Sequence, residues 1–366
     1  MSLKSWKFWF GIIISIIFLY LFIKDIEWER LWQIIKSVNA YYLIAVVAVN
    51  LFSFVIRALR WGYFFQQETR PPFRSLFSTT SIGFMANTVL PLRIGEIVRA
   101  VLLGKKENIS KSTCLGTLVV ERLFDMLAIL FFFAIFIIFY SLPLGNNTTE
   151  QEYVQYIKVA GYSSGILCLV VIVVIIMLRF WTNQALALVE WLTKLIPANL
   201  REHVLHITRS FITGLNILKD GSAFFISVVL SLLLWLVIIF QTYLFFYVFD
   251  LPLGFSEAIF LLVVMAFSVM IPAAPGYVGT FHYGTELALI LMAVERNTAK
   301  AFAIVAHVFS MFSITVVGFF YLWLENLSLF ELPQQQFVTD PEAEEADVPG
   351  VREQEERSEP RERSND

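Results

Sequence analysis

Charged residues are scarce in this sequence: Asp, Glu, Lys and Arg make up 16% of the chain, whereas hydrophobic residues make up 58%. Soluble domains are about half apolar and carry about a quarter charged residues. The low charge and the mean hydropathy of +0.70 therefore exclude an ordinary soluble domain. The net charge of −3 and the lack of a basic cluster give no reason to expect a nucleic-acid partner.

Several chemical signatures are also missing. The two cysteines, Cys114 and Cys168, lie in or beside apolar segments, so we expect small core residues rather than a disulfide. Four histidines do not complete any zinc-ligand pattern, and we expect no metal. The sequence has no G-x-x-x-x-G-K-[ST] loop and no G-x-S-x-G turn, so neither ATP hydrolysis, a cofactor nor a serine hydrolase is expected.

Long hydrophobic runs predict an all-α polytopic membrane protein. A helix needs about 20 largely uncharged residues to span a bilayer. Several runs supply that length without the alternation of apolar and polar residues that membrane β-strands show. About six full crossings are predicted, at Phe8–Ile23, Tyr41–Trp61, Leu115–Tyr140, Ser163–Phe180, Ala223–Phe249 and Ala301–Leu324.

Two further apolar regions are interrupted by helix breakers. Ser75–Leu103 contains Pro91 and Gly95, and Ser256–Met292 contains the second set: Pro272, Pro275, Gly276 and Gly279. Lysine and arginine concentrate after the first region but are absent from the link before the second. Because this bias marks cytoplasmic loops, we expect two re-entrant hairpins that enter from opposite sides of the membrane.

The same charge bias predicts the location and the orientation of the chain. Lys4 and Lys7 place the N-terminus in the cytoplasm, and an even number of crossings returns the C-terminus to the same side. We expect one transmembrane domain over residues 1–330 in the cytoplasmic membrane. Residues 331–366 are polar, charged and punctuated by proline, which predicts a disordered tail.

The interrupted regions resemble each other. Pro91 precedes Gly95 by four positions, and Pro275 precedes Gly279 by the same spacing. Opposite sides of entry would make the regions an inverted repeat, a frequent construction in secondary transporters. The alternative is chance similarity, because proline and glycine are common in transmembrane helices.

The stretch Ala86–Ala100 places three charged residues, Arg93, Glu96 and Arg99, on one face of a helix. Pro91 suits the first turn of a helix, where free N–H groups and the positive dipole end attract anions. Two arginines beside such an end predict a phosphate site, since guanidinium binds phosphate in bidentate fashion. The alternative is that the arginines only set topology.

A second group of charges lies at the head of a long apolar segment. The run "VVERLFDMLAILFFF" contains Glu121, Arg122 and Asp125, with the two carboxylates one helical turn apart. Ionisable groups at membrane depth are costly and usually face a protein interior or an aqueous cavity. We interpret the three as a functional network; the alternative is that the segment is still interfacial at this point.

The third stretch, "IPAAPGYVGTFHYGTE", combines backbone freedom with titratable side chains. Gly276 and Gly279 permit positive φ and close approach, and Pro275 stops a helix. His282 lies one turn before a glutamate, and His307 lies in an otherwise apolar helix. The histidines are candidates for a proton relay or for hydrogen bonds between helices.

These motifs, in this order, resemble a known family. "N-x-x-L-P-x-R-x-G-E-x-x-R" over Asn87–Arg99, "E-R-x-x-D" over Glu121–Asp125 and "P-G-x-x-G" over Pro275–Gly279 are similar to the lysylphosphatidylglycerol synthase transmembrane region, or flippase-like domain. The resemblance covers nearly the whole chain up to about Leu324. It departs in two ways: no aminoacyl-transferase domain is expected, and His282 stands where the family often has glutamate.

The resemblance implies movement of a lipid or lipid-linked headgroup between leaflets, not an enzyme. The expected partner is an anionic phospholipid or a lipid of the polyprenyl-phosphate type. The alternatives are an accessory subunit of an envelope glycosyltransferase or lipid-modifying enzyme, and a membrane enzyme acting on lipid phosphates. The expected substrate-binding residues are Asn87, Arg93, Glu96, Arg99, Glu121, Arg122, Asp125, Pro275, Gly276, Gly279, His282 and His307.

Overall fold

The computed structural model describes residues 6–90, 94–139, 220–271 and 275–328, together with 155, 159, 161–163, 165–170 and 173. Helix is the regular secondary structure throughout these ranges, which confirms the all-α prediction. The predicted crossing at Ser163–Phe180 lies largely outside the described residues, and the predicted tail over 331–366 lies wholly outside them.

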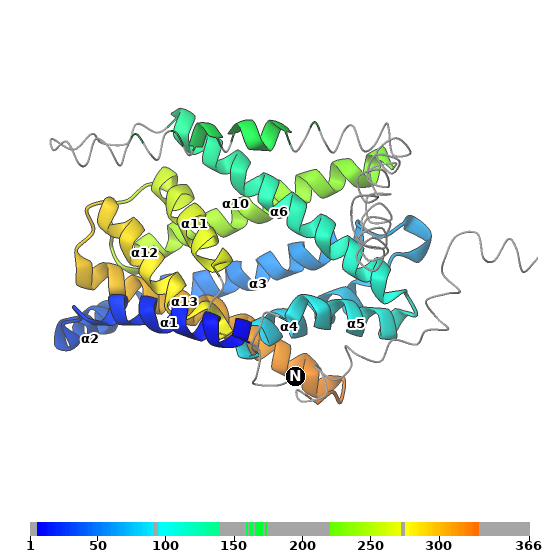
Figure 1. Ribbon diagram of the computed structural model, residues 1–366, viewed down its shortest axis with the longest axis horizontal. Helices are drawn as coiled ribbons and strands as arrows, with labels where there is room; N and C mark the ends of the chain where they lie inside the picture. The colour runs from blue at the N-terminus through cyan, green and yellow to red at the C-terminus, as the bar shows by residue number, and fades with distance from the viewer. Residues whose placement is uncertain are drawn as a thin grey trace, which may run out of the picture.

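The helices run mostly along the long axis of the molecule, horizontal in Figure 1. Their bounds are α1 Trp6–Ile23, α2 Trp28–Ser37, α3 Ala40–Gly62, η1 Gln67–Thr69, α4 Phe73–Val89, α5 Gly95–Glu107, α6 Lys111–Phe139, α10 Gly221–Val248, α11 Phe255–Met270, η4 Pro275–Tyr277, α12 Thr280–Leu291 and α13 Arg296–Leu324. Three of the described helices, α3, α10 and α13, are long and apolar enough to cross a membrane.

Two ends of the bundle are distinguished by sequence. We call the end where α5 stops and α6 begins the lysine-rich end, after Lys105, Lys106 and Lys111; it lies at the right in Figure 1. The opposite end carries α2, and we call it the α2 end. Trp28 and Trp32 of α2 are exposed, as is typical of aromatic side chains at a membrane–water interface.

Both interrupted regions form hairpins, as predicted. In the first, Lys106 near the end of α5 donates a hydrogen bond to Ser78 near the start of α4 (3.0 Å). The hairpin therefore starts with α4 and finishes with α5 at the lysine-rich end. In the second, Gly284 of α12 packs directly against Ser268 of α11. The two tips meet inside the bundle, where Gly276 of η4 lies against the backbone of Thr88 in α4.

The contacts between helices follow one pattern in two halves of the chain. In the first half α3 packs on α4, α4 on α5 and α5 on α6; in the second, α10 packs on α11, α11 on α12 and α12 on α13. The halves also exchange equivalent contacts, because α4 packs on α13 and α11 packs on α6. The central helices α3 and α10 run in opposite directions, with Asn39 N–H donating to the Val248 carbonyl at 3.0 Å. This pattern supports the inverted repeat.

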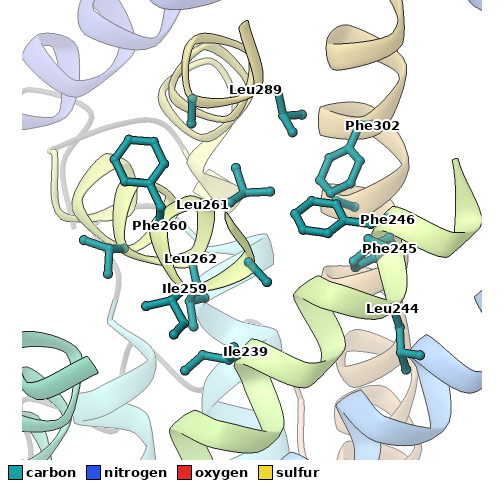
Figure 2. Close-up of a cluster of buried hydrophobic side chains, with 14 of the residues drawn as sticks. Ile239, Leu244, Phe245, Phe246, Ile259, Phe260, Leu261, Leu262, Leu289 and Phe302 are labelled. Atoms are coloured by element: carbon teal, nitrogen blue, oxygen red, sulfur yellow. The ribbon is translucent and has the colours of Figure 1, made fainter. Parts of the chain in front are cut away.

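The largest apolar core lies toward the α2 end (Figure 2). There α11 packs against α10 through Ile259 and Ile239, and Phe302 of α13 lies against Phe245 (ring centroids 5.6 Å) and Phe246 (6.0 Å) of α10. A second core at the lysine-rich end joins α3, α5 and α6 and includes Cys114, which is buried and not in a disulfide. These cores fix the helices between which the charged residues lie.

Glycine permits the close contact inside the first hairpin. A Cβ atom on Gly95 would lie 1.9 Å from the Gly83 carbonyl oxygen, so a Gly95→Ala substitution must push α5 away from α4. We expect the substitution to lower the free energy of unfolding by about 1–3 kcal/mol, the usual cost of overpacking. Thermal unfolding in detergent measures this change.

Gly221→Ala is the matched control, because a Cβ atom at Gly221 would meet no atom within 4 Å. Equal unfolding temperatures for the two variants would show that the hairpin is not packed as described.

Candidate functional site

Seven charged residues from three helices gather between the lysine-rich end and the hairpin tips. We call this group the charged cluster: Arg57 and Arg60 of α3, Glu96 and Arg99 of α5, and Glu121, Arg122 and Asp125 of α6. Glu121 lies ten residues into α6, or about 15 Å along the helix at 1.5 Å per residue. The cluster is therefore well inside the bundle.

Arg99 and Glu121 form its central pair. Two nitrogens of the Arg99 guanidinium donate to the two oxygens of Glu121, each at 3.0 Å, and the side chains are 1% and 0% exposed. Arg99 Nη2 also donates to the Thr80 hydroxyl at 3.2 Å. Its guanidinium lies over the Trp61 ring, 4.2 Å from the centroid. This bidentate, stacked geometry is specific to arginine.

Asp125 forms ion pairs with both arginines of α3. Its Oδ1 lies 2.7 Å from Arg60 Nη1 and accepts a hydrogen bond from Trp235 Nε1 of α10 at 3.0 Å. Its Oδ2 lies 3.5 Å from Arg57 Nη1 and 3.3 Å from Arg122 Nη2. Asp125 thus ties α6 to both α3 and α10.

The charges do not cancel within the charged cluster. Four arginines face three carboxylates, and among the buried members three arginines face two carboxylates. Five buried guanidinium nitrogens have no hydrogen-bond partner, on Arg57, Arg60 (two), Arg99 and Arg122, whereas one carboxylate oxygen, on Asp125, lacks one. A surplus of buried N–H donors is the arrangement that receives an anion, since unpaired buried charge is costly.

One side of the charged cluster is open. The Arg122 side chain is 40% exposed and that of Glu96 is 42% exposed; they pair with each other at 3.4 Å. Leu115 and Val119 lie on the same face of α6 as Arg122 and are exposed. This edge therefore places a charged pair beside apolar side chains that face outward from the bundle.

Asn87 holds the tip of the first hairpin. Its Oδ1 accepts a hydrogen bond from the Gly95 N–H at 2.7 Å, which satisfies a free donor at the start of α5. We predicted that the start of this helix would offer its N–H groups to an anion, but the side chain of Asn87 already occupies this one. Arg93 lies outside the described residues.

The glycines and His282 of the second hairpin form a separate group with His307 of α13. Gly276 and Gly279 adopt positive φ angles of 68° and 91°, as the turn after Pro275 requires. His282 and His307 are neighbours, with ring centroids 4.6 Å apart. A ring nitrogen of His307 contacts the Gly276 carbonyl, and His282 Nδ1 accepts from the Gly279 N–H at 3.4 Å.

The predicted residues thus divide into two groups, one on the first hairpin and α6 and the other on the second hairpin and α13, and the sequence pattern did not indicate two members of the first. Arg57 and Arg60 lie inside the predicted crossing Tyr41–Trp61, three positions apart on one helix face. Charges within a predicted crossing were the available signal. Among the described residues, His, Cys, Asp and Glu do not form a group of three that could hold a metal ion.

Comparison with known proteins gives one family. The chain matches the family described as the lysylphosphatidylglycerol synthase TM region over residues 8–318, from α1 into α13. It is 24% identical to a UPF0104 membrane protein of Methanothermobacter thermautotrophicus over 80% of this chain and 87% of that protein. Two UPF0104 membrane proteins of Methanocaldococcus jannaschii are 27% and 24% identical, over 46% and 68% of this chain and 51% and 98% of their own lengths. No solved structure matches the chain.

Removing Glu121 tests how strongly the charged cluster stabilises the fold. Glu121→Gln keeps the shape of the side chain but leaves Arg99 without its carboxylate and raises the buried surplus of positive charge. Breaking a buried pair costs about 3–5 kcal/mol, so we expect a large fall in the free energy of unfolding. Thermal unfolding followed by size-exclusion chromatography measures this fall.

Glu68→Gln is the matched control, because Glu68 is exposed on η1 at the same end of the bundle. If the two variants unfold at the same temperature, Glu121 is not paired with Arg99 in the folded protein.

Proposed function

This chain belongs to the family of the lysylphosphatidylglycerol synthase TM region, and we propose that it moves a lipid with an anionic phosphate headgroup between membrane leaflets. The movement needs no ATP hydrolysis by this protein. The observation that carries the proposal is the buried surplus of arginine in the charged cluster, with guanidinium donors left unpaired. A bound phosphodiester carries one negative charge, which is the charge that the seven residues lack.

The open edge supplies the route for such a lipid. A headgroup reaching Arg122 and Glu96 would leave its acyl chains beside Leu115 and Val119, which already face outward. The headgroup therefore need not cross the apolar face of a helix. Arg57 and Arg60 lie one step further in, where their unpaired donors can form charge-assisted hydrogen bonds with phosphate oxygens.

The two hairpins supply the change of access. In this proposal the lysine-rich end faces the cytoplasm, where Lys106 pairs with Glu325 beyond the end of α13. That pair holds the end of the first hairpin against α13, and breaking it would let the hairpin move once the headgroup is bound at the open edge. The second hairpin, with its turn at Pro275–Gly279 and its two histidines, would then act from the other leaflet. Motion of one repeat against the other is the usual form of alternating access.

The proposal is tested first by the lipids that the purified protein retains. Native mass spectrometry is applied to the wild type and to Arg122→Gln after exchange into a mixture of phosphatidylglycerol and phosphatidylcholine. We expect the wild type to enrich phosphatidylglycerol and Arg122→Gln to reduce that enrichment by at least about tenfold, since one charge-assisted contact contributes about 1.5–3 kcal/mol. Lys105→Gln, an exposed cation at the same end, is the control and should retain the enrichment.

Movement is then measured in liposomes with acyl-labelled phosphatidylglycerol and a membrane-impermeant quencher. Wild type and Lys105→Gln should transfer the label between leaflets, and Arg122→Gln should be slower. Equal retention and equal movement of the two lipids would contradict a site for a headgroup with a net negative charge, because phosphatidylcholine carries a phosphate but no net charge. Retention without movement, with an envelope enzyme copurifying, would favour the accessory-subunit alternative.

A further inference from the structure

A second buried ion pair lies at the α2 end, in the other half of the repeat. Lys300 of α13 is fully buried, and its Nζ donates a hydrogen bond to the Phe22 carbonyl of α1 at 2.6 Å. Glu286 of α12 is 5% exposed, and its Oε1 lies 3.7 Å from Lys300 Nζ. The pair joins α12 to α13, whereas Arg99 and Glu121 join α5 to α6, so the signs of the two partners are exchanged between the halves.

The Glu286 carboxylate is poorly bound. Its distance to Lys300, and the 3.8 Å from Oε1 to Arg296 Nε, both exceed the length of a hydrogen bond. Its other oxygen, Oε2, has no hydrogen-bond partner, although it is buried. A pair that served only to hold α12 to α13 would use those donors directly, as Arg99 and Glu121 do. A buried carboxylate with an unused oxygen is suited instead to accept a proton.

Glu286 is one side chain away from solvent at the α2 end. Arg296 has a 54% exposed side chain and lies 3.3 Å from Asp25 Oδ2, whose side chain is 47% exposed. Arg296 thus contacts both the buried carboxylate and a surface carboxylate. A proton in the solution at this end reaches Glu286 by passing one partly exposed residue.

Titratable groups continue inward from Glu286. His282 lies one helical turn before it on α12, and the His282 ring is 4.6 Å from that of His307. His307 contacts the carbonyl of Gly276, which packs against Thr88 at the tip of the first hairpin. The groups therefore run from the α2 end to the point where the two hairpins meet.

The charges of this group balance, unlike those of the charged cluster. The charged groups beside Glu286 are Arg296 and Lys300 on α13, and Asp25 after α1 pairs with Arg296. His282 lies one turn away on α12, and its ring neighbours that of His307 on α13. Glu257 is the charged residue of α11, and its Oε2 accepts a hydrogen bond from the Gly254 N–H at the start of that helix at 3.1 Å. With neutral histidines, two cations face two carboxylates. One added proton gives this group the same surplus of one positive charge that the charged cluster has.

We propose that Glu286, with Lys300, is a proton-binding site open to the solution at the α2 end, and that this proton accompanies the lipid headgroup. The coupling rests on the function proposed above; the proton site itself does not. Protonation takes the negative charge from Glu286 and leaves this group with a surplus of one positive charge, which a phosphate on the outer side would balance. A phosphodiester and one proton together carry no net charge, so the paired movement is electrically neutral.

The proton site is tested without reference to transport. Infrared difference spectra of the purified protein in nanodiscs, recorded between about pH 5 and pH 8, report protonated carboxyl groups. We expect a carboxyl band that titrates in the wild type and in Glu29→Gln, disappears in Glu286→Gln and shifts in Glu286→Asp. Glu29 is an exposed carboxylate of α2 and is the matched control. Identical spectra for wild type and Glu286→Gln overturn the proton site, whether or not lipid moves.

Coupling is tested in the liposome assay with labelled phosphatidylglycerol. The rate of movement should change by about tenfold when the pH at the α2 end shifts by one to two units, in the wild type and in Glu29→Gln, but not in Glu286→Gln. If the carboxyl band titrates but the rate of lipid movement does not depend on pH, the coupling is overturned. A titrating band with no movement at any pH supports the proton site and overturns the proposed function.

Discussion

The attraction between arginines of α3 and α5 and carboxylates of α6 is the interaction on which the architecture depends. Burying these charges is expensive, and the geometry offsets the cost only while every partner stays in place. Asp125 must reach Arg60 and Trp235 at the same time, so α3, α6 and α10 have fixed separations there. Thr80 on α4 adds the first hairpin to the same network through Arg99. A shift of any one of these helices exposes an unpaired charge to an apolar interior.

Much of the fold could be predicted from hydrophobic length and helix breakers. The two hairpins follow from proline and glycine inside apolar regions, and their opposite directions follow from lysine and arginine bias. The bounds were less accurate: the predicted crossing that starts at Ala301 begins five residues earlier, at Arg296. Lys300 therefore fell just outside a predicted helix, although the structure buries it completely.

The site could be predicted only in part, because sequence spacing reveals neighbours on one helix but not partners on another. Glu121 and Asp125 were found because they share a face of α6. Arg57 and Arg60 share a face of α3 in the same way, yet their partners lie more than fifty residues later in the chain. Asn87 was found through a motif, and its role as a backbone acceptor for Gly95 required the folded hairpin.

The two halves of the repeat share the same helix contacts but differ in their charged residues. Each places a buried ion pair between the returning helix of its hairpin and the long helix that follows. In the first half the pair is bidentate and surrounded by further arginines; in the second it is loose and electrically balanced. Because the two halves of the inverted repeat differ in chemistry, the two ends of the molecule present different charged groups. An exactly symmetric repeat would present the same groups at both ends.

The surplus positive charge of the charged cluster also has a consequence for how the protein is made. A buried charge that is not balanced destabilises the folded state, so an anion that binds there would stabilise it by mass action. In the function proposed above, the lipid would then be part of the folded structure as well as the cargo. On that proposal, a membrane poor in such lipids would hold less of the folded protein, and the abundance of the protein would follow the supply of the lipid.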